Sequence, residues 1–206
     1  MSQYAELKCL LDSGVGERRI VRWLKADREN ALILSRTFTT APFGNKIITE
    51  FQFGTDFKAD FVLFAPFSGG FDIDFVEIEP PNEPLYTKKG IPAARLATAI
   101  KQVQDWKLFV EAHRETVVRE LDKASKKKEL IWGEPGTNLM DNGGWPIYHP
   151  KAWLKWRYHI VIGRRHGLSE EDLQRKASSE DIIKVDIVTF DHLLEHALKE
   201  ARPDWS

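Results

Sequence analysis

Three β-rich runs close together in the first half of the chain constrain the fold more than any other feature. They cover residues 47–53, 60–67 and 71–79, and glycine-containing turns at Gly54 and at residues 68–70 separate them. Turns of this kind join antiparallel neighbours. The Pro80–Pro81 pair ends the third run, because proline cannot donate to a strand ladder. We therefore expect a three-stranded antiparallel meander.

Helical patterns lie on both sides of this meander. The first ~35 residues have helical spacing of apolar residues, and residues 92–127 predict one long helix with Pro92 in its first turn. Residues 129–151 predict an ordered loop in which Trp132 and Trp145 are buried. The rest predicts a strand at 158–162, a helix at 169–176, a strand at 182–190 and a helix at 191–201. The predicted fold is α/β: a mixed sheet flanked by helices, with residues 1–40 as a helical segment packed on a domain of residues 41–206.

Composition excludes several classes of protein. The chain has 206 residues, 42% of them hydrophobic and 30% charged, which is typical of a globular protein. A single cysteine, Cys9, allows no internal disulfide and no thiol cluster for zinc. No run approaches the ~20 apolar residues of a membrane helix, and residues 1–11 lack the apolar core of a signal peptide. We expect a cytoplasmic protein with no membrane partner.

Opposite charges are segregated along the chain, although the net charge is only −1. Residues 50–83 contain eight acids and the single cation Lys58, whereas residues 142–169 contain five lysines and arginines and no acid. This pattern suits a metal-dependent enzyme acting on a polyanion, because carboxylates hold the cation and basic residues hold phosphates. Two solvated faces of different charge are the alternative.

The third β-rich run ends in a pair of carboxylates. Side chains alternate along a strand, so Glu77 and Glu79 share one face, ~7 Å apart, while Val76 and Ile78 point to the other. A hairpin with the preceding run would bring Asp60 beside Glu77. Converging carboxylates repel one another unless a proton or a cation relieves them, and Mg²⁺ is the simplest relief. The alternative is a half-exposed sheet whose acids face water.

Five short motifs occur in an order that resembles a known family: Phe53-Gly54, then residues 58–63, 76–81, 85–90 and 99–106. Together they resemble the nuclease domain of the Shedu family of bacterial anti-phage defence proteins. That family belongs to the PD-(D/E)XK nucleases, which have the restriction-endonuclease-like fold. The resemblance is dense from about residue 50 to residue 111.

The resemblance implies a set of site residues. Asp60 and Glu77 correspond to the metal-binding acids of the two core strands, and the main-chain carbonyl of Ile78 would complete the shell of the ion. Gln102 corresponds to a helix glutamine that could orient a water or a phosphate oxygen. The implied cofactor is Mg²⁺, with Mn²⁺ as a substitute.

One position departs from the parent nuclease pattern, which has a lysine where this chain has Glu79. Either Glu79 holds a metal, or the positive role belongs to Lys88, Lys89 or Lys101, with the segment that contains Lys88 preferred. A nuclease fold that no longer cuts is the third alternative. Glu17 is either an accessory acid of the site or an ordinary glutamate on a helix surface.

The implied activity is metal-dependent endonucleolytic hydrolysis of DNA in a Shedu-like defence system. The candidate phosphate contacts are Lys89, Lys155, Arg157, Arg164 and Arg165. Residues 153–159 are equally consistent with a core strand with basic ends. The alternative function is a catalytically silent nuclease fold that binds nucleic acid or a partner protein. A homo-oligomer, dimer or tetramer, is expected, and the choice between DNA and RNA stays open.

Two other motifs carry less weight. Residues 192–196 match the His-x-x-Glu-His pattern of a zinc peptidase, but a third ligand further downstream would be expected, and only ten residues follow. Gly14-Val15-Gly16 has no strand before it and no third glycine, so it is not a nucleotide-binding loop.

Overall fold

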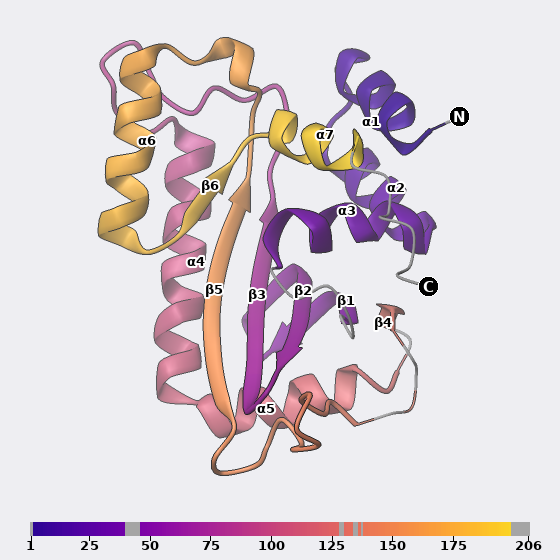
Figure 1. Cartoon of the computed structure of the whole chain (residues 1–206). Coiled ribbons are helices and arrows are strands. Elements are labelled where there is room, and N and C mark those ends of the chain that lie inside the picture. Colours follow the sequence, from indigo (N-terminus) through magenta and orange to yellow (C-terminus); the bar gives the residue numbers. More distant parts are fainter. Residues whose placement is uncertain (1, 40–45, 128–129, 134–135, 137, 199–206) are drawn as a thin grey trace.

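The computed structural model of the chain describes residues 2–39, 46–127, 130–133, 136 and 138–198 (Figure 1). Within these residues the elements form one mixed sheet with helices on both faces. This is the restriction-endonuclease-like α/β class that the sequence predicted, including the helical N-terminal segment.

The sheet has six strands in the order β4-β1-β2-β3-β5-β6. The predicted meander is confirmed: β1 (Lys46–Phe53), β2 (Phe57–Phe67) and β3 (Gly70–Ile78) pair antiparallel in sequence order. β4 (Leu130–Trp132) adds antiparallel to β1. β5 (Trp153–Val161) and β6 (Asp186–Val188) add in parallel on the other side, next to β3.

The N-terminal helices and the last helix cover one face of the sheet. They are α1 (Gln3–Asp12), α2 (Glu17–Ala26), α3 (Arg28–Phe38) and α7 (Phe190–Leu198). Their apolar stripes pack with Val76 and Ile78 of β3 and with Phe61 and Leu63 of β2 into one core. Val76 and Ile78 therefore point to this face, as alternation along the strand predicted.

Helices α4 (Ala94–Ala112) and α5 (Arg114–Ala124) cover the other face, where Phe75 and Trp106 lie in the second core. The prediction of one long helix over residues 92–127 was wrong. The backbone leaves helical geometry at His113 (φ −128°, ψ 32°), which lets α5 turn and bury Val117 and Leu121. No glycine or proline marks this break in the sequence.

The C-terminal half differs from the sequence prediction in its element lengths. Helix α6 (Glu170–Ile183) opens on the Ser169 capping box and continues through residues assigned to the 182–190 strand, so that only Asp186–Val188 is β. Ile182 is 81% exposed, because it ends this helix instead of entering the sheet. Strand β5 begins five residues earlier than predicted.

The loop before β5 also differs from prediction in its aromatic burial. Trp145 is 37% exposed and stacks on His149, with ring centres 4.5 Å apart, while Trp132 is half-buried. Burial of Trp145 was therefore wrongly predicted. Trp153 at the start of β5 is also exposed and lies edge-on to Phe67. The last predicted helix is α7, and residues 199–201 of that prediction lie outside the described residues.

Candidate metal centre

The candidate site lies where β2 begins and β3 ends. In the antiparallel register Phe61 pairs with Val76, so the next residues along, Asp60 and Glu77, are opposite each other. The hairpin expected from the sequence thus brings these two carboxylates together. Asp60 Oδ2 accepts a hydrogen bond from the main-chain N–H of Ile78 at 2.9 Å, which fixes the side chain across the strand pair.

Helix α4 contributes the third predicted residue of the site. Gln102 Nε2 donates to Glu77 Oε1 at 2.8 Å, so the amide holds the carboxylate from the helical side of the sheet. Glu77 is therefore on the α4 face, as expected for a residue that alternates with Val76 and Ile78. Gln102 acts on Glu77 directly, and in this arrangement it is a positioning residue.

Strands β1 and β2 are irregular near Asp60. Ile48 and Phe51, three residues apart on β1, lie in the same core, as do Ala59 and Val62 on β2. Regular alternation would put residues three apart on opposite faces. Opposite Asp60, Glu50 has a positive φ of 50°, which is rare for a residue with a Cβ. Strained backbone of this kind clusters at functional sites.

Two further carboxylates lie at the same edge. Glu79 follows β3 directly and is buried, and Glu17 is the first residue of α2 and is half-buried. The charge of Glu17 acts on Glu79, and that of Asp60 acts on both. Arg95 on α4 places Nη1 3.8 Å from Glu79 Oε2. Four carboxylates from α2, β2, β3 and the following loop therefore share one region with one arginine.

Burial and mutual repulsion disfavour the charged forms of these acids. Burial, followed by the charge of Asp60, raises the pKa of Glu77 to about 9. Burial, followed by the charge of Glu17, raises the pKa of Glu79 to about 7. Burial also raises the pKa of Asp60, against the hydrogen bond from Ile78. The protein's own cations leave this repulsion largely unrelieved.

The donor set fits a hard divalent cation with few protein ligands. Among the described residues no three histidine, cysteine or acidic side chains are placed to hold a metal ion together. Mg²⁺ does not need such a cage, because it keeps several waters and takes one or two carboxylates. Asp60 and Glu77 supply that pair, and the buried Glu79 Oε2 has no hydrogen-bond partner. A bound cation or its waters would satisfy a buried carboxylate oxygen that has no hydrogen bond.

The lysines proposed for the missing positive charge lie elsewhere. Lys88 and Lys89 are exposed in the loop that Tyr86 and Pro92 close by a β-bridge. Lys101 is 75% exposed and pairs with Asp105, one turn along α4, at 2.8 Å. Within the described part of the chain, none of the three lies within ion-pair distance of Asp60, Glu77 or Glu79.

The predicted phosphate contacts on β5 face away from the candidate site. Arg157 pairs with Asp72 and lies 3.9 Å from Asp74, and Lys155 lies 3.9 Å from Asp72. Asp72 and Asp74 alternate with Ile73 and Phe75 of the α4-side core, so these pairs are on the side of the N-terminal helices. Beyond β5, Arg164 and Arg165 pair with acids of α7: Asp191 at 3.0 Å and Glu195 at 2.6 Å.

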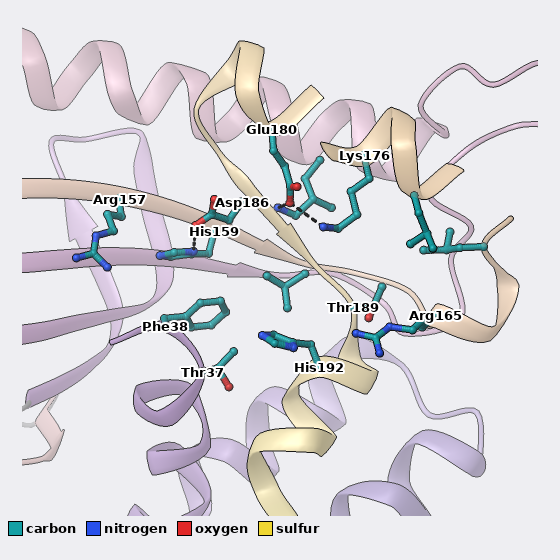
Figure 2. A pocket seen from close by; sticks show the side chains of 14 residues that line it. Thr37, Phe38, Arg157, His159, Arg165, Lys176, Glu180, Asp186, Thr189 and His192 are labelled. Atoms are coloured by element: carbon teal, nitrogen blue, oxygen red, sulfur yellow. Dashed lines mark hydrogen bonds and ion pairs between the residues drawn. The ribbon is translucent and has the colours of Figure 1, made fainter. Parts of the chain in front are cut away.

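Arg157 and Arg165 line a cavity of about 400 Å³ between α3, β5, β6, α6 and α7, here called the α3–β6 pocket (Figure 2). Figure 2 shows the imidazole of His159 pointing at Asp186, with Phe38 beneath it. His159 is 3% exposed and is held between Asp74 Oδ1 at 2.7 Å and Asp186 Oδ2 at 3.0 Å. The burial of the ring lowers its pKa, but the two carboxylates outweigh burial and raise it.

All five basic side chains of the α3–β6 pocket have a carboxylate within ion-pair distance. Lys176 pairs with Glu180 at 2.9 Å, and His192 pairs with Glu195 at 3.2 Å, in addition to the pairs of Arg157, His159 and Arg165. The charges of this pocket are thus compensated within the protein. It is an internal ion-pair network, and it leaves little positive charge for a phosphate.

A family model of the C-terminal part of the Shedu protein SduA matches residues 18–194. The chain belongs to the Shedu SduA C-terminal family. A comparison with curated proteins gave no match. The match includes Asp60, Glu77, Glu79 and Gln102, and it extends beyond the 50–111 region in which the sequence motifs are dense.

Sequence reasoning missed one residue of the candidate site, Arg95, and left a second, Glu17, open as an accessory acid or a helix-surface glutamate. Arg95 was not singled out, because an arginine at the start of a helix carries no signal of its own. Glu17 was preferred as a surface glutamate, yet α2 places it near Asp60 and Glu79. The one sequence signal for Glu17 was its position directly after the Gly14–Gly16 break, where a helix could begin.

No helix of the described residues is long and apolar enough to cross a membrane.

Proposed function

We propose that this chain is a Mg²⁺-dependent deoxyribonuclease that acts in Shedu-type anti-phage defence. The observation that carries the proposal is the Asp60–Glu77 carboxylate pair, with Glu77 hydrogen-bonded by Gln102, in a chain of the Shedu SduA C-terminal family. RNA is a substrate to be tested beside DNA.

In this proposal Asp60, Glu77 and the main-chain carbonyl of Ile78 hold the cation. A bound Mg²⁺ would lower the pKa of a coordinated water and neutralise the scissile phosphate. Gln102 keeps the Glu77 carboxylate oriented, and the Ile78 N–H keeps Asp60 oriented. Residues held in this way need no rearrangement when the substrate arrives.

We assign the positive role of the missing lysine to Arg95. Its guanidinium lies beside Glu79 at the edge of the carboxylate group, and it is 56% exposed and so accessible to a phosphate oxygen. An arginine can donate two parallel hydrogen bonds to a phosphate. Glu79 then positions Arg95 through their ion pair, which explains how a carboxylate can stand where the parent pattern has lysine.

The decisive experiment measures cleavage of supercoiled and linear DNA, with RNA of the same sequence in parallel. Wild type and Asp60→Asn are compared with Mg²⁺, Mn²⁺ or EDTA present. Asp105→Asn is the matched control, because this acid lies on α4 and, among the described residues, its one ion pair is with Lys101. Cleavage that requires the metal and Asp60 but not Asp105 is expected. Cleavage by Asp60→Asn equal to wild type would disprove the proposal.

A catalytically silent nuclease fold is the second candidate, and the acid at position 79 favours it. Such a protein would bind DNA in the presence of EDTA and would leave every substrate intact with either metal. Binding without cleavage by a folded wild-type protein would therefore replace the first proposal by the second. The predicted dimer or tetramer, measurable by light scattering, stays a prediction for both.

A further inference from the structure

A second cavity lies on the α4 face of the sheet, between α4, the start of α5, β5 and the end of α6. Its volume is about 360 Å³, and we call it the α4–β5 pocket. Its lining is three basic side chains, two aromatic rings, one acid and Val110: Lys107, Arg114, Lys184, Trp156, Tyr158 and Glu111. This is the combination of a cationic rim and an aromatic wall.

The basic side chains of this pocket are not neutralised as those of the α3–β6 pocket are. Among the described residues no carboxylate lies within 4.0 Å of Lys107 Nζ or of the Arg114 guanidinium. Lys107 donates instead to the main-chain carbonyl of Ile183 at 2.8 Å, and Nζ lies 5.9 Å from the centre of the Tyr158 ring. Lys184 reaches only Asp181, at 3.9 Å and largely in solvent, which contributes little. The lining has three positive charges against the single acid Glu111.

The aromatic wall is held rigidly by the strand. Tyr158 is buried and stacks on Phe75 with ring centres 5.4 Å apart. Trp156, two residues earlier on the same face of β5, packs against Phe75 with ring centres 6.0 Å apart, is only partly buried and lines the pocket. A large ring that is fixed on one side and open on the other is a stacking platform.

The backbone at the lip of the pocket is strained. Lys184 ends α6 in the left-handed conformation, with φ 54° and ψ 47°, where glycine or asparagine is the usual residue. This conformation is unfavourable for a residue with a Cβ. A lysine in this conformation lowers the stability of the folded state but places its ammonium at the pocket. The strain therefore indicates a role for that charge.

We propose that the α4–β5 pocket binds a nucleotide unit, with the base against Trp156 and the phosphate on the rim of Lys107, Arg114 and Lys184. A simple anion would use the rim alone, whereas a nucleotide uses the rim and the ring. The nucleotide unit could come from two sources with the same chemistry: a free mononucleotide or one nucleotide of a strand. The experiment below distinguishes these two sources.

This pocket is separate from the carboxylate site. Lys107 follows Gln102 by five residues on α4, so the two side chains leave the helix about 140° apart. Gln102 turns to Glu77 on β3, and Lys107 turns to Tyr158 on β5 and to the end of α6. Nucleotide binding here therefore does not depend on metal binding or on cleavage.

The test is calorimetric titration in EDTA with three probes: adenosine 5′-monophosphate, inorganic phosphate and a short oligothymidylate. Arg114→Gln and Lys184→Asn are the main variants, because both side chains are exposed and asparagine accepts the backbone of Lys184. Each is expected to weaken nucleotide binding roughly tenfold. Arg119→Gln is the matched control: it lies on α5, is 68% exposed and pairs with Glu115 away from the pocket. We expect it to bind as wild type does.

Two more variants separate a nucleotide from a simple anion. Trp156→Leu should weaken the nucleotide by roughly tenfold, as expected for the loss of one stacked base, and leave phosphate unchanged. Glu111→Gln should tighten both, since it removes the repelling charge. If the mononucleotide binds with this pattern, the ligand is a free nucleotide; if only the oligonucleotide does, it is a strand.

The proposal would be overturned if neither the mononucleotide nor the oligonucleotide bound, or if Arg114→Gln and Lys184→Asn behaved like Arg119→Gln. Equal loss of phosphate and nucleotide binding in a folded Trp156→Leu variant would also overturn it. Asp60→Asn should bind the nucleotide like wild type. A chain that binds nucleotide in this way but cuts no DNA would leave this inference standing and disprove only the nuclease.

Discussion

At the carboxylate site, burial favours the neutral form of acids whose proposed role needs the charged form. In the proposed metal site Glu77 would be a charged ligand, yet burial and the charge of Asp60 raise its pKa to about 9. The protein thus keeps an acid in a place that favours its neutral form. A bound divalent cation would stabilise such a site, because its charge would offset both the repulsion between the acids and the cost of their burial.

In the absence of metal, the free energy of unfolding should depend on pH through Glu77. The pKa of Glu77 rises from 4.5 in the unfolded chain to about 9 in the folded one. The folded state then binds the extra proton between these values, so the free energy of unfolding falls as pH rises from 4.5 toward 9. Glu77→Gln lacks this titration. In EDTA, urea unfolding should show the variant gaining stability over wild type as pH rises through this window.

Magnesium should reverse that trend. A bound cation favours charged Glu77, so it should raise the melting temperature of wild type more at high pH than at low pH. Glu77→Gln should show a much smaller increase at every pH. A difference between wild type and variant that is the same at all pH values would contradict the assignment of Glu77 to a buried, repelled carboxylate.

The second prediction tests Arg95 against the lysines. Arg95→Gln should lower kcat for Mg²⁺-dependent cleavage by roughly a hundredfold, the usual effect of losing one donor to a developing charge. Lys88→Gln and Lys101→Gln should change kcat by much less, because both side chains are exposed away from the carboxylates. A large loss in Lys88→Gln with normal activity in Arg95→Gln would instead give the positive role to Lys88.

At the scale of elements, one glycine joins three segments near the site. Gly163 follows β5, donates to the carbonyl of Pro80 at 3.2 Å and accepts from the N–H of Phe190 at 3.1 Å. Its φ is 65°, and a Cβ there would be 2.7 Å from the main-chain oxygen of Glu83. The loop after β3 and the start of α7 thus meet on a position that only glycine suits.

Gly163→Ala should therefore lower the free energy of unfolding by about 2 kcal/mol or more, measured by urea denaturation. Gly167→Ala is the control, because its φ is not in the left-handed region and nothing lies within 4 Å of the added Cβ. It should change stability by less than about 0.5 kcal/mol. Equal effects of the two substitutions would show that the contact of Gly163 with Glu83 does not matter.

Element types were predicted well from the sequence, and element ends were not. The glycine turns and the proline pair gave the meander because they act locally. The break at His113 and the start of β6 depend on packing: α5 turns to bury Val117 and Leu121, and α6 continues to Ile183, so that β6 begins only at Asp186. Nothing in the local sequence encodes either event.

At the scale of the whole molecule, the sheet separates two cores. One contains Phe75 and Trp106, and the other contains residues from α1–α3 and α7 together with Phe61 and Val76. Burial of apolar area on both faces is the main favourable term for a sheet of this size. The N-terminal helices are therefore a structural layer of the fold as well as the source of Glu17.

This arrangement predicts the effect of deleting residues 1–38. The deletion would expose one apolar face of the sheet, including Ile47, Phe61, Leu63 and Ile78, and the remaining chain should lose cooperative unfolding as followed by circular dichroism. A shorter deletion of residues 1–2, which carry no buried side chain in the described part, serves as control. Cooperative unfolding of the long deletion near the wild-type temperature would show that residues 41–206 fold on their own.

The meander, the fold class, the family resemblance and the meeting of Asp60 with Glu77 could all be predicted from the sequence, because strand alternation and short turns fix which residues of a hairpin are opposed. Only the tertiary structure shows that Glu17 and Arg95 lie near Asp60 and Glu77. It also shows that Arg157 and Arg165 form ion pairs within the protein. It also decided that Lys107, Arg114 and Lys184 line one pocket. These groups come from elements far apart in the chain, and only the packing of helices on the two faces of the sheet sets which of them meet.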